Sequence, residues 1–277
     1  MPIYLDNHAT TKPDPRVLEA MLPWLTEHYG NAGSSTHAMG REARDAVEGA
    51  RARFAAAIGG APNEIVFTSG ATEAINLALQ GVSARQRGGA AGGAAPGAIL
   101  TLATEHSAVL DTLDHLARLG HRVVRLPVNG GGTLDGAVLA EAIERERPFL
   151  LSVLLAHNEI GVVQDLPAIV AVAGRQGVLV HVDAAQAPGR MPLDVGRMGC
   201  DLASFSGHKV HAPKGSGALW VRRSGKPVRP KPLLFGGGQE RGLRSGTHDV
   251  AGIVGLDRKS TRLNSSHRSV SRMPSSA

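Results

Sequence analysis

The residues with the clearest chemical potential follow short apolar runs of the sequence. Asp183 directly follows the run Val178–Val182, and Lys209 follows the run Asp201–Phe205 after three residues. A lysine amine can attach covalently to an aldehyde, and a buried carboxylate can hold a proton on a neighbouring nitrogen base. Either residue could instead be structural, because an aspartate after a strand often caps the next helix.

A third segment is typical of a phosphate site. The β-rich run Glu64–Thr68 is followed by Ser69–Glu73 and then by the apolar-periodic run Ala74–Leu79. Free N–H groups at the start of a helix attract anions, and small side chains let a phosphate approach them. The alternative is an ordinary helix start, with Ser69 or Thr72 as the capping residue.

These groups can meet only if the apolar runs are strands of one sheet. Short apolar runs alternate with helical patterns, which predicts an α/β fold with a mostly parallel central sheet flanked by helices. Ligands of such sheets bind beyond the carboxyl ends of the strands. The predicted strands are Glu64–Thr68, Ile99–Leu102, Phe149–Leu155, Val178–Val182, Asp201–Phe205 and Ala218–Val221. The polar segments expected at their shared edge are Ser69–Glu73, Glu105–His106, His157–Gly161, Asp183–Gln186 and Ser206–Lys209.

Together these groups meet the needs of pyridoxal 5′-phosphate (PLP). The helix start would hold the phosphate, Lys209 would form a Schiff base with the aldehyde, and Asp183 would keep the pyridine nitrogen protonated. Opposite charges about 4 Å apart at an effective dielectric of about 20 attract by roughly 4 kcal/mol, or about three pKa units. That attraction is enough to keep the ring nitrogen cationic at neutral pH.

Segments in a fixed order carry a resemblance to a known family. They are Tyr4–Thr11, Glu64–Glu73, Thr104–His106, Asn158–Gln164, His181–Gln186, Ser204–Lys209, Pro213–Gly215, Gly236–Gly242 and Arg244–Thr247. With them the chain resembles, from Ile3 to about Leu256, the NifS/IscS group of cysteine desulfurases, which are class V aminotransferases among the fold-type I PLP enzymes. The resemblance implies conversion of L-cysteine to L-alanine, with the sulfur passed as a persulfide to an iron–sulfur scaffold or another acceptor protein, for cluster assembly or tRNA thiolation.

The resemblance also assigns roles to single residues. Lys209, Asp183 and His106 would be catalytic, with His106 stacked on the cofactor ring and able to shuttle protons. The Tyr4–Thr11 segment would line the substrate entrance. Thr247 would reach the phosphate of the partner subunit, which implies a homodimer. The other expected cofactor-binding residues are Ala71, Thr72, Ser206 and His208 for the phosphate, and Asn158 and Gln186 for the ring or its oxygen.

The resemblance ends near Leu256, before the family's nucleophilic cysteine and its substrate-binding arginine. We therefore expect residues 1–257 to form the PLP-binding large domain, with the small C-terminal domain missing. Residues 258–277, with seven serines, read as a disordered and non-native tail. Cys200 precedes the predicted strand that Lys209 follows, so it cannot replace the nucleophile. We expect this chain to be an inactive desulfurase.

Composition excludes several other classes of protein. Residues 258–277 carry five basic and no acidic side chains, so residues 1–257 hold 25 basic and 24 acidic ones. The body therefore offers no basic face for nucleic acid. One cysteine excludes a disulfide scaffold and a multi-cysteine metal site. No apolar run is long enough to cross a bilayer and no targeting segment is evident, so we expect a cytoplasmic protein.

Three alternatives stay open. A selenocysteine lyase or another class V aminotransferase would share much of the pattern, although the Asn158–Gly161 and Arg244–Thr247 motifs favour the NifS/IscS group. The second alternative is a non-catalytic fragment that keeps the PLP domain but lacks the small domain. The third is a metal-dependent hydrolase with His181, Asp183, His208 and His211 as ligands. That alternative leaves Lys209 unexplained, and we expect no metal.

Overall fold

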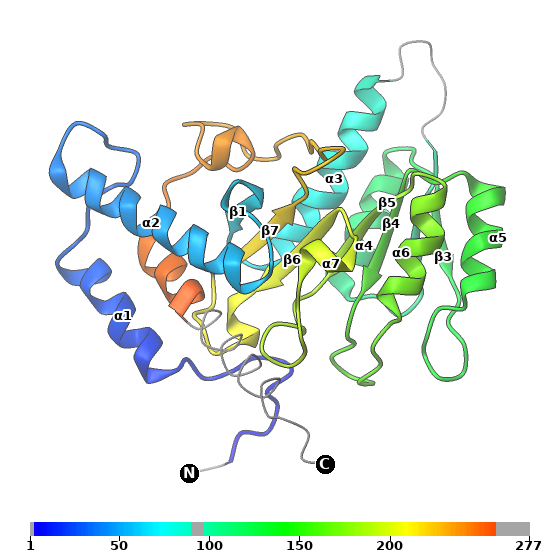
Figure 1. The fold of residues 1–277 in the computed structure, drawn as a ribbon, viewed down its shortest axis with the longest axis horizontal. Coiled ribbons are helices and arrows are strands. Elements are labelled where there is room, and N and C mark those ends of the chain that lie inside the picture. The colour runs from blue at the N-terminus through cyan, green and yellow to red at the C-terminus, as the bar shows by residue number, and fades with distance from the viewer. Residues whose placement is uncertain (1–2, 90–96, 259–277) are drawn as a thin grey trace, which may run out of the picture.

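A seven-stranded sheet lies at the centre of the molecule, and helices cover both of its faces (Figure 1). The structure is a computed structural model that describes residues 3–89 and 97–258. The strand order is β1-β7-β6-β5-β4-β2-β3, and β7 alone runs antiparallel to its neighbours. The predicted mostly parallel sheet is confirmed. The strands are β1 (Ile65–Thr68), β2 (Ile99–Leu102), β3 (Val123–Leu126), β4 (Leu150–Leu154), β5 (Leu179–Asp183), β6 (Leu202–Ser206) and β7 (Gly217–Val221).

The helices divide between the two faces of the sheet. Helices α3 and α4 pack with Val66, Ile99 and Leu150 on one face. Helices α2, α5, α6 and α7 pack with Phe67 and Leu100 on the other face. Neighbouring strand residues thus enter opposite cores, as the two-residue repeat of a strand requires. The helices are α1 (Pro15–Thr26), α2 (Ala38–Ala57), α3 (Ala71–Gly89), α4 (Ser107–Arg118), α5 (Gly136–Glu146), α6 (Leu166–Arg175) and α7 (Val195–Met198), and residues 250–258 are also helical.

Every residue of β4 is buried, because helices cover the sheet on both sides. This explains the continuous apolar run that marks β4 in the sequence. Two of the helices that cover the sheet begin at aspartates. Asp135 accepts a hydrogen bond from Ala137 N–H at 2.7 Å, and Asp165 accepts one from Ala168 N–H at 3.2 Å. These caps start α5 and α6 on the same face.

A buried ion pair fastens the loop after β7 to the sheet. Arg51 on α2 donates both terminal nitrogens to Glu240, at 2.7 and 2.8 Å, and their side chains are only 3% and 1% exposed. Glu240 also accepts from Phe67 N–H at 2.8 Å and contacts His248 Nε2 at 2.6 Å. Burial raises the pKa of Glu240, but the hydrogen bonds from His248 and Arg51 outweigh it and bring the pKa to about 2. The carboxylate is therefore held as an anion inside the protein.

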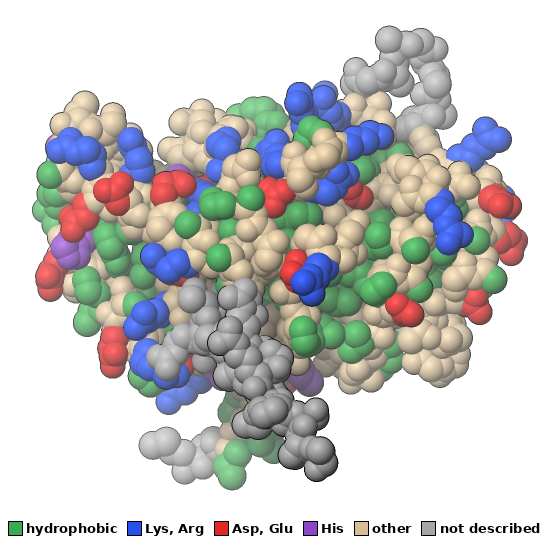
Figure 2. Space-filling model, viewed as in Figure 1, with side chains coloured by type: hydrophobic (Ala, Val, Ile, Leu, Met, Phe, Trp, Pro, Cys, Tyr) green, Lys and Arg blue, Asp and Glu red, His purple; other side chains and the backbone are tan. Residues whose placement is uncertain are grey.

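The surface agrees with the near-neutral charge of residues 1–257. Acidic and basic side chains both occur over the face shown in Figure 2, with apolar side chains between them. Among residues 3–89 and 97–258, no helix combines the length and the apolarity that a bilayer crossing requires. The predicted tail begins at Arg258, which is helical, and the rest of it lies outside the described residues.

Candidate active site

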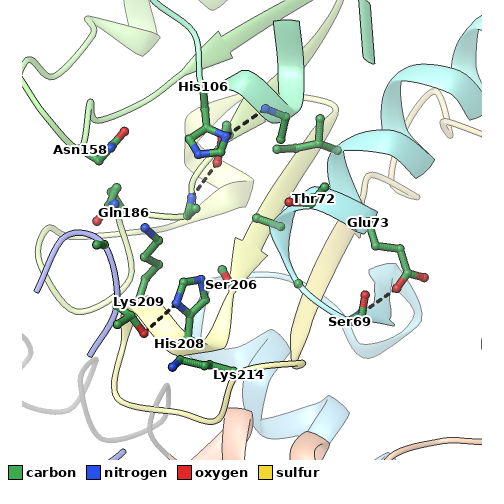
Figure 3. Close-up of a pocket in the computed structure, with 18 of the residues that line it drawn as sticks. Ser69, Thr72, Glu73, His106, Asn158, Gln186, Ser206, His208, Lys209 and Lys214 are labelled. Atoms are coloured by element: carbon green, nitrogen blue, oxygen red, sulfur yellow. Dashed lines mark hydrogen bonds between the residues drawn. The ribbon is translucent and has the colours of Figure 1, made fainter. Parts of the chain in front are cut away.

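A cavity of about 590 Å³ lies at the carboxyl ends of the parallel strands (Figure 3). Its walls come from segments that directly follow strands, as the sequence predicts for this edge. Ala9 and Thr10 of the N-terminal segment also line it. The predicted site residues that line it are Ala71, Thr72, His106, Asn158, Asp183, Gln186, Ser206, His208 and Lys209.

Asp183 supplies a buried carboxyl group to the cavity. It is the last residue of β5, is 2% exposed, and accepts a hydrogen bond from Ala185 N–H at 3.0 Å. Burial raises the pKa of Asp183, against the opposing effects of the Ala185 N–H and of the charges on His106 and Lys209. A cation placed beside this carboxylate would offset the cost of burying its charge.

Lys209 supplies the amine. It ends the short turn Gly207–Lys209 that follows β6, and its Nζ donates to the carbonyl oxygen of His8 at 2.5 Å. Burial lowers the pKa of Lys209, and the charge of Arg190 lowers it further, whereas Asp183 and Asp6 act in the opposite direction. A lowered pKa increases the neutral fraction of the amine, which is the nucleophilic form.

The start of α3 forms the corner suited to a phosphate. The first N–H groups of a helix have no partner within it, and the first two residues of α3, Ala71 and Thr72, have small side chains and line the cavity. Gly70 has a φ of 153°, and a Cβ placed on it would meet only Ser206 Oγ, at 4.0 Å. Glu73, rather than Ser69 or Thr72, binds a backbone group of this turn, accepting from Ser69 N–H at 2.8 Å. The turn therefore leaves room for a ligand beside Gly70.

His106 lies at the start of α4. Its Nδ1 accepts a hydrogen bond from Ala108 N–H at 3.0 Å, which caps the helix. Because Nδ1 is an acceptor, the neutral ring carries its proton on Nε2. The helix thus sets the tautomer of an imidazole that lines the cavity.

The preceding residue, Glu105, has surroundings that the sequence did not reveal. Its Oε1 accepts from Leu154 N–H at 2.8 Å, and its Oε2 is buried without a hydrogen-bond partner in the described part of the chain. Burial raises the pKa of Glu105 well above its ordinary value, and the nearby Asp183 carboxyl adds to the effect. Burial therefore disfavours the charged form of Glu105.

The residues considered as metal ligands do not converge. His181 is fully buried, with Nδ1 2.9 Å from Ser152 Oγ and Nε2 2.8 Å from Ser204 Oγ. Burial lowers the pKa of His181 to about 3, so the ring is neutral. His208 contacts Thr10. Within residues 3–89 and 97–258, no three His, Cys, Asp or Glu side chains are arranged to hold a metal ion.

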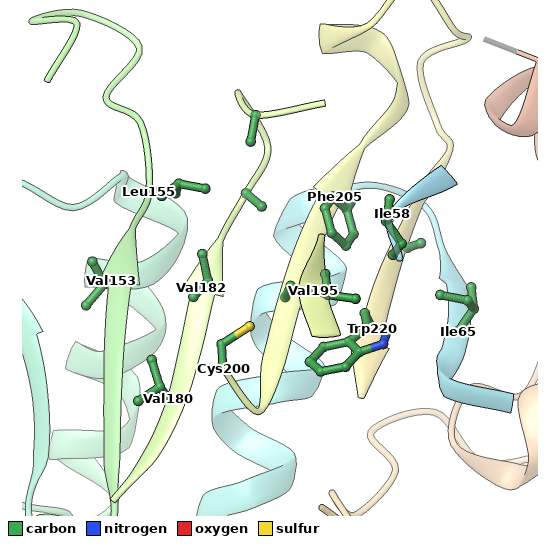
Figure 4. Close-up of a cluster of buried hydrophobic side chains, with 14 of the residues drawn as sticks. Ile58, Ile65, Val153, Leu155, Val180, Val182, Val195, Cys200, Phe205 and Trp220 are labelled. Atoms are coloured by element: carbon green, nitrogen blue, oxygen red, sulfur yellow. The ribbon is translucent and has the colours of Figure 1, made fainter. Parts of the chain in front are cut away.

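Cys200 lies in the hydrophobic core (Figure 4). It is 0% exposed, and burial raises the pKa of its thiol to about 12, with a further contribution from Asp201. It precedes β6, whereas Lys209 follows the far end of that strand. The thiol is therefore protonated, shielded and at the opposite edge of the sheet from the amine.

Thr247 lies apart from the other predicted residues. It lines a separate cavity of about 110 Å³, whose wall also includes Ser69 and Gly215. Ser69 and Gly215 also line the main cavity, so the two cavities share part of their walls. Its contact with a partner subunit's phosphate stays a prediction.

Comparison with known proteins adds the family. The family described as aminotransferase class-V matches residues 3–268. The chain belongs to the class-V aminotransferase family. It is similar to proteins named cysteine desulfurase IscS, with 47% identity over 256 residues to the one from Rickettsia felis and 49% identity over 257 residues to the one from Neisseria meningitidis serogroup C. The predicted resemblance to the NifS/IscS group is confirmed.

These alignments cover most of the chain but only part of the relatives. Each covers 92% of this chain, and they cover 60% and 61% of the two relatives. The chain therefore spans about 60% of the length of the curated relatives it matches.

Solved structures of similar proteins have the same fold. A NifS-like protein superposes with a TM-score of 0.90 at 39% identity, over 98% of this chain and 72% of that one. The structure described as SspA in complex with cysteine gives a TM-score of 0.85 at 38% identity, over 94% of this chain and 72% of that one. The predicted fold class is thereby confirmed.

Proposed function

We propose that this chain binds PLP at the cavity and uses it to act on the Cα of L-cysteine, as a cysteine desulfurase does. The observation that carries the proposal is the presence of the Lys209 amine and the Asp183 carboxyl on the walls of one cavity at one sheet edge. Sequence similarity to IscS proteins and the cysteine complex of a structural relative support the choice of substrate.

The residues of the cavity fit PLP. A volume of about 590 Å³ is within the usual range for small-molecule sites. The room beside Gly70 at the start of α3 suits a phosphate. The buried Asp183 carboxyl suits a protonated ring nitrogen, because each charge would offset the other's cost of burial.

Each wall residue then has a defined task. Lys209 would hold the aldehyde end of the cofactor, Asp183 its ring nitrogen, and the start of α3 its phosphate. Bound PLP supplies an electron sink that stabilises negative charge on the substrate Cα. Lys209 Nζ and the His106 imidazole lie on the cavity wall, where they can take a proton from the substrate and return it.

The first test concerns Asp183 and uses a reaction that needs no thiol nucleophile. In heavy water with PLP, the wild-type chain should exchange the α-proton of L-alanine, which proton NMR detects. Asp183→Asn should retain bound cofactor and slow this exchange by about 100-fold or more, because the electron sink needs a protonated ring nitrogen. Asp194→Asn, at the start of α7, is the control and should leave the exchange unchanged. Wild-type exchange in Asp183→Asn would contradict the assignment.

The second test concerns sulfur. Transfer requires a thiolate that attacks the sulfur of bound cysteine, so that an S–S bond forms as the Cβ–S bond of the substrate breaks. The electron pair of the broken bond stays with the substrate, which takes up a proton and is released as alanine. Cys200, the single cysteine of the sequence, is buried and protonated and cannot do this. We expect the 277-residue chain to form little sulfide or alanine from cysteine, and Cys200→Ser to behave like the wild type. Robust turnover that Cys200→Ser abolishes would show that the buried thiol participates.

The remaining parts of the proposal concern partners. A homodimer would bring Thr247 of one subunit towards the phosphate of the other, and Thr247 lines a cavity that shares Ser69 and Gly215 with the main one. An acceptor protein, such as an iron–sulfur scaffold, would receive the persulfide sulfur in the cytoplasm.

A further inference from the structure

Arg190 joins its own segment, which includes Gln186 four residues earlier, to the N-terminal segment and to Lys209. Its Nη1 donates to the side-chain oxygen of Gln186. Its Nη2 donates to the backbone carbonyl of Asn7 at 2.8 Å and to that of Lys209 at 3.2 Å. In the described part of the chain, Arg190 thus binds one amide oxygen and two backbone carbonyl oxygens, whereas a surface ion pair would place a carboxylate beside it.

The same three segments contact one another on the cavity side of Arg190. The carbonyl oxygen of His8 accepts from Gln186 Nε2 at 3.0 Å and from Lys209 Nζ at 2.5 Å. In Figure 3, the Gln186 and Lys209 side chains lie next to each other beside the N-terminal segment. We call Asn7, His8, Gln186, Arg190 and Lys209 the arginine clamp.

We propose that Arg190 is a positioning residue that holds the Lys209 backbone and the Gln186 amide in place through the arginine clamp, so that the lysine amine is directed into the cavity. The inference rests on the proposed function, because it takes Lys209 as the residue that attaches the cofactor. Arg190 itself does not line the cavity and would touch neither cofactor nor substrate.

The chemistry of the side chain explains why this residue is an arginine. A guanidinium is planar and presents five N–H donors in a rigid fork, so it can bind several carbonyl oxygens at once. A lysine at this position would keep the positive charge but would lose the fork. A methionine would keep the unbranched stem and lose both.

Arg190 also acts on Lys209 through its charge. Burial lowers the pKa of Lys209 and the Arg190 cation lowers it further, whereas Asp183 and Asp6 raise it. The other titratable side chains that line the cavity are Glu73, His106, His208 and Lys214. Removal of the Arg190 charge should therefore raise the pKa of Lys209 and reduce its neutral fraction at a given pH.

The test compares Arg190→Lys and Arg190→Met with Arg197→Met. The Arg197 side chain is 91% exposed and contacts its neighbour Asp194 at 3.6 Å, so it serves as a matched surface control. The first readout is amide hydrogen exchange without PLP. Thr11 N–H donates to the His208 carbonyl at 2.8 Å, so its exchange rate reports on the contact between the N-terminal segment and the turn Gly207–Lys209. Both Arg190 variants should exchange this amide about tenfold faster, since each loses charged hydrogen bonds, and Arg197→Met should not.

The second readout is the rate of PLP capture, followed by visible absorption. Both Arg190 variants should capture PLP about tenfold more slowly, because the amine is no longer held in place. The pH at which capture reaches half its maximal rate should rise in Arg190→Met, because the positive charge that lowers the pKa of Lys209 is lost. It should stay unchanged in Arg190→Lys, which keeps that charge. The two variants therefore distinguish the effect of the charge from the effect of the hydrogen bonds.

Two results would overturn the inference. One is that both Arg190 variants exchange the Thr11 amide and capture PLP at the wild-type rates. The other is that Arg190→Lys alone shows wild-type rates in both measurements. If instead no PLP is captured by the wild type, the proposed function fails, whereas the exchange measurement still decides whether the clamp exists.

Discussion

Lys209→Ala should abolish the visible absorption band that the protein acquires with PLP. The Lys209 amine extends from the end of β6 into the cavity that also holds Asp183. Burial and the neighbouring Arg190 lower its pKa, so a larger fraction is neutral and able to attach to the aldehyde. Loss of this amine removes the covalent link, and we expect PLP to dissociate on gel filtration.

Two variants make this result specific. Lys209→Arg keeps the positive charge but cannot attach to an aldehyde, so it should lose the band as completely as alanine does. Lys214→Ala removes another amine that lines the same cavity, and it should keep the band. An unchanged spectrum in Lys209→Ala, or loss of the band only in Lys214→Ala, would refute the assignment of Lys209.

Glu240→Ala should lower the free energy of unfolding by about 3–5 kcal/mol, which urea denaturation at pH 7 would measure. The substitution leaves the buried guanidinium of Arg51, whose side chain is only 3% exposed, with the exposed Glu48 carboxylate as its ion-pair partner, at 3.1 Å. It also removes the acceptor of Phe67 N–H. In the control, Arg51→Met combined with Glu240→Met removes both charges and should recover much of the loss, because two apolar side chains replace the pair. A loss below about 1 kcal/mol in Glu240→Ala would show that the pair contributes no more than a surface ion pair.

The same pair predicts how stability depends on pH. The pKa of Glu240 is about 2 in the folded protein and near its ordinary value of 4.5 when unfolded. A depressed folded pKa contributes stability that is fully present above the unfolded pKa and is lost as pH falls towards the folded pKa. The contribution of Glu240 should therefore fade between pH 4.5 and pH 2. Glu240→Gln should unfold with a shallower dependence on pH in that window.

Glu240 and the phosphate corner lie in one connected region. The loop after β7 also carries Arg244, whose Nε donates to Glu73 at 2.7 Å, and Glu73 accepts from Ser69 N–H. A loosened loop would therefore weaken support for the turn at the start of α3. We expect Glu240→Ala to reduce PLP affinity as well as stability.

The strands and the cavity were largely predictable from the sequence. Buried strands such as β4 and β5 appear as apolar runs, because both faces of the sheet are covered. Parallel strands gather the residues after their carboxyl ends at one edge, so Asp183 and Lys209 were expected together. The sequence patterns did not predict the strand β3 or the helices α1, α5 and α6. In β3 the burial is only partial, which weakens the apolar signal.

The sequence by itself determined the family, the mostly parallel sheet and the residues at its carboxyl edge, since these depend on local pattern and motif order. Tertiary structure alone decided the burial of Glu105, the pairing of Arg51 with Glu240 across 189 positions, and the convergence of Arg190 on Asn7 and Lys209. Charged residues of these types are usually exposed, and nothing in their neighbours along the chain marks them as exceptions. Their partners are chosen by packing between distant segments, which no local pattern records.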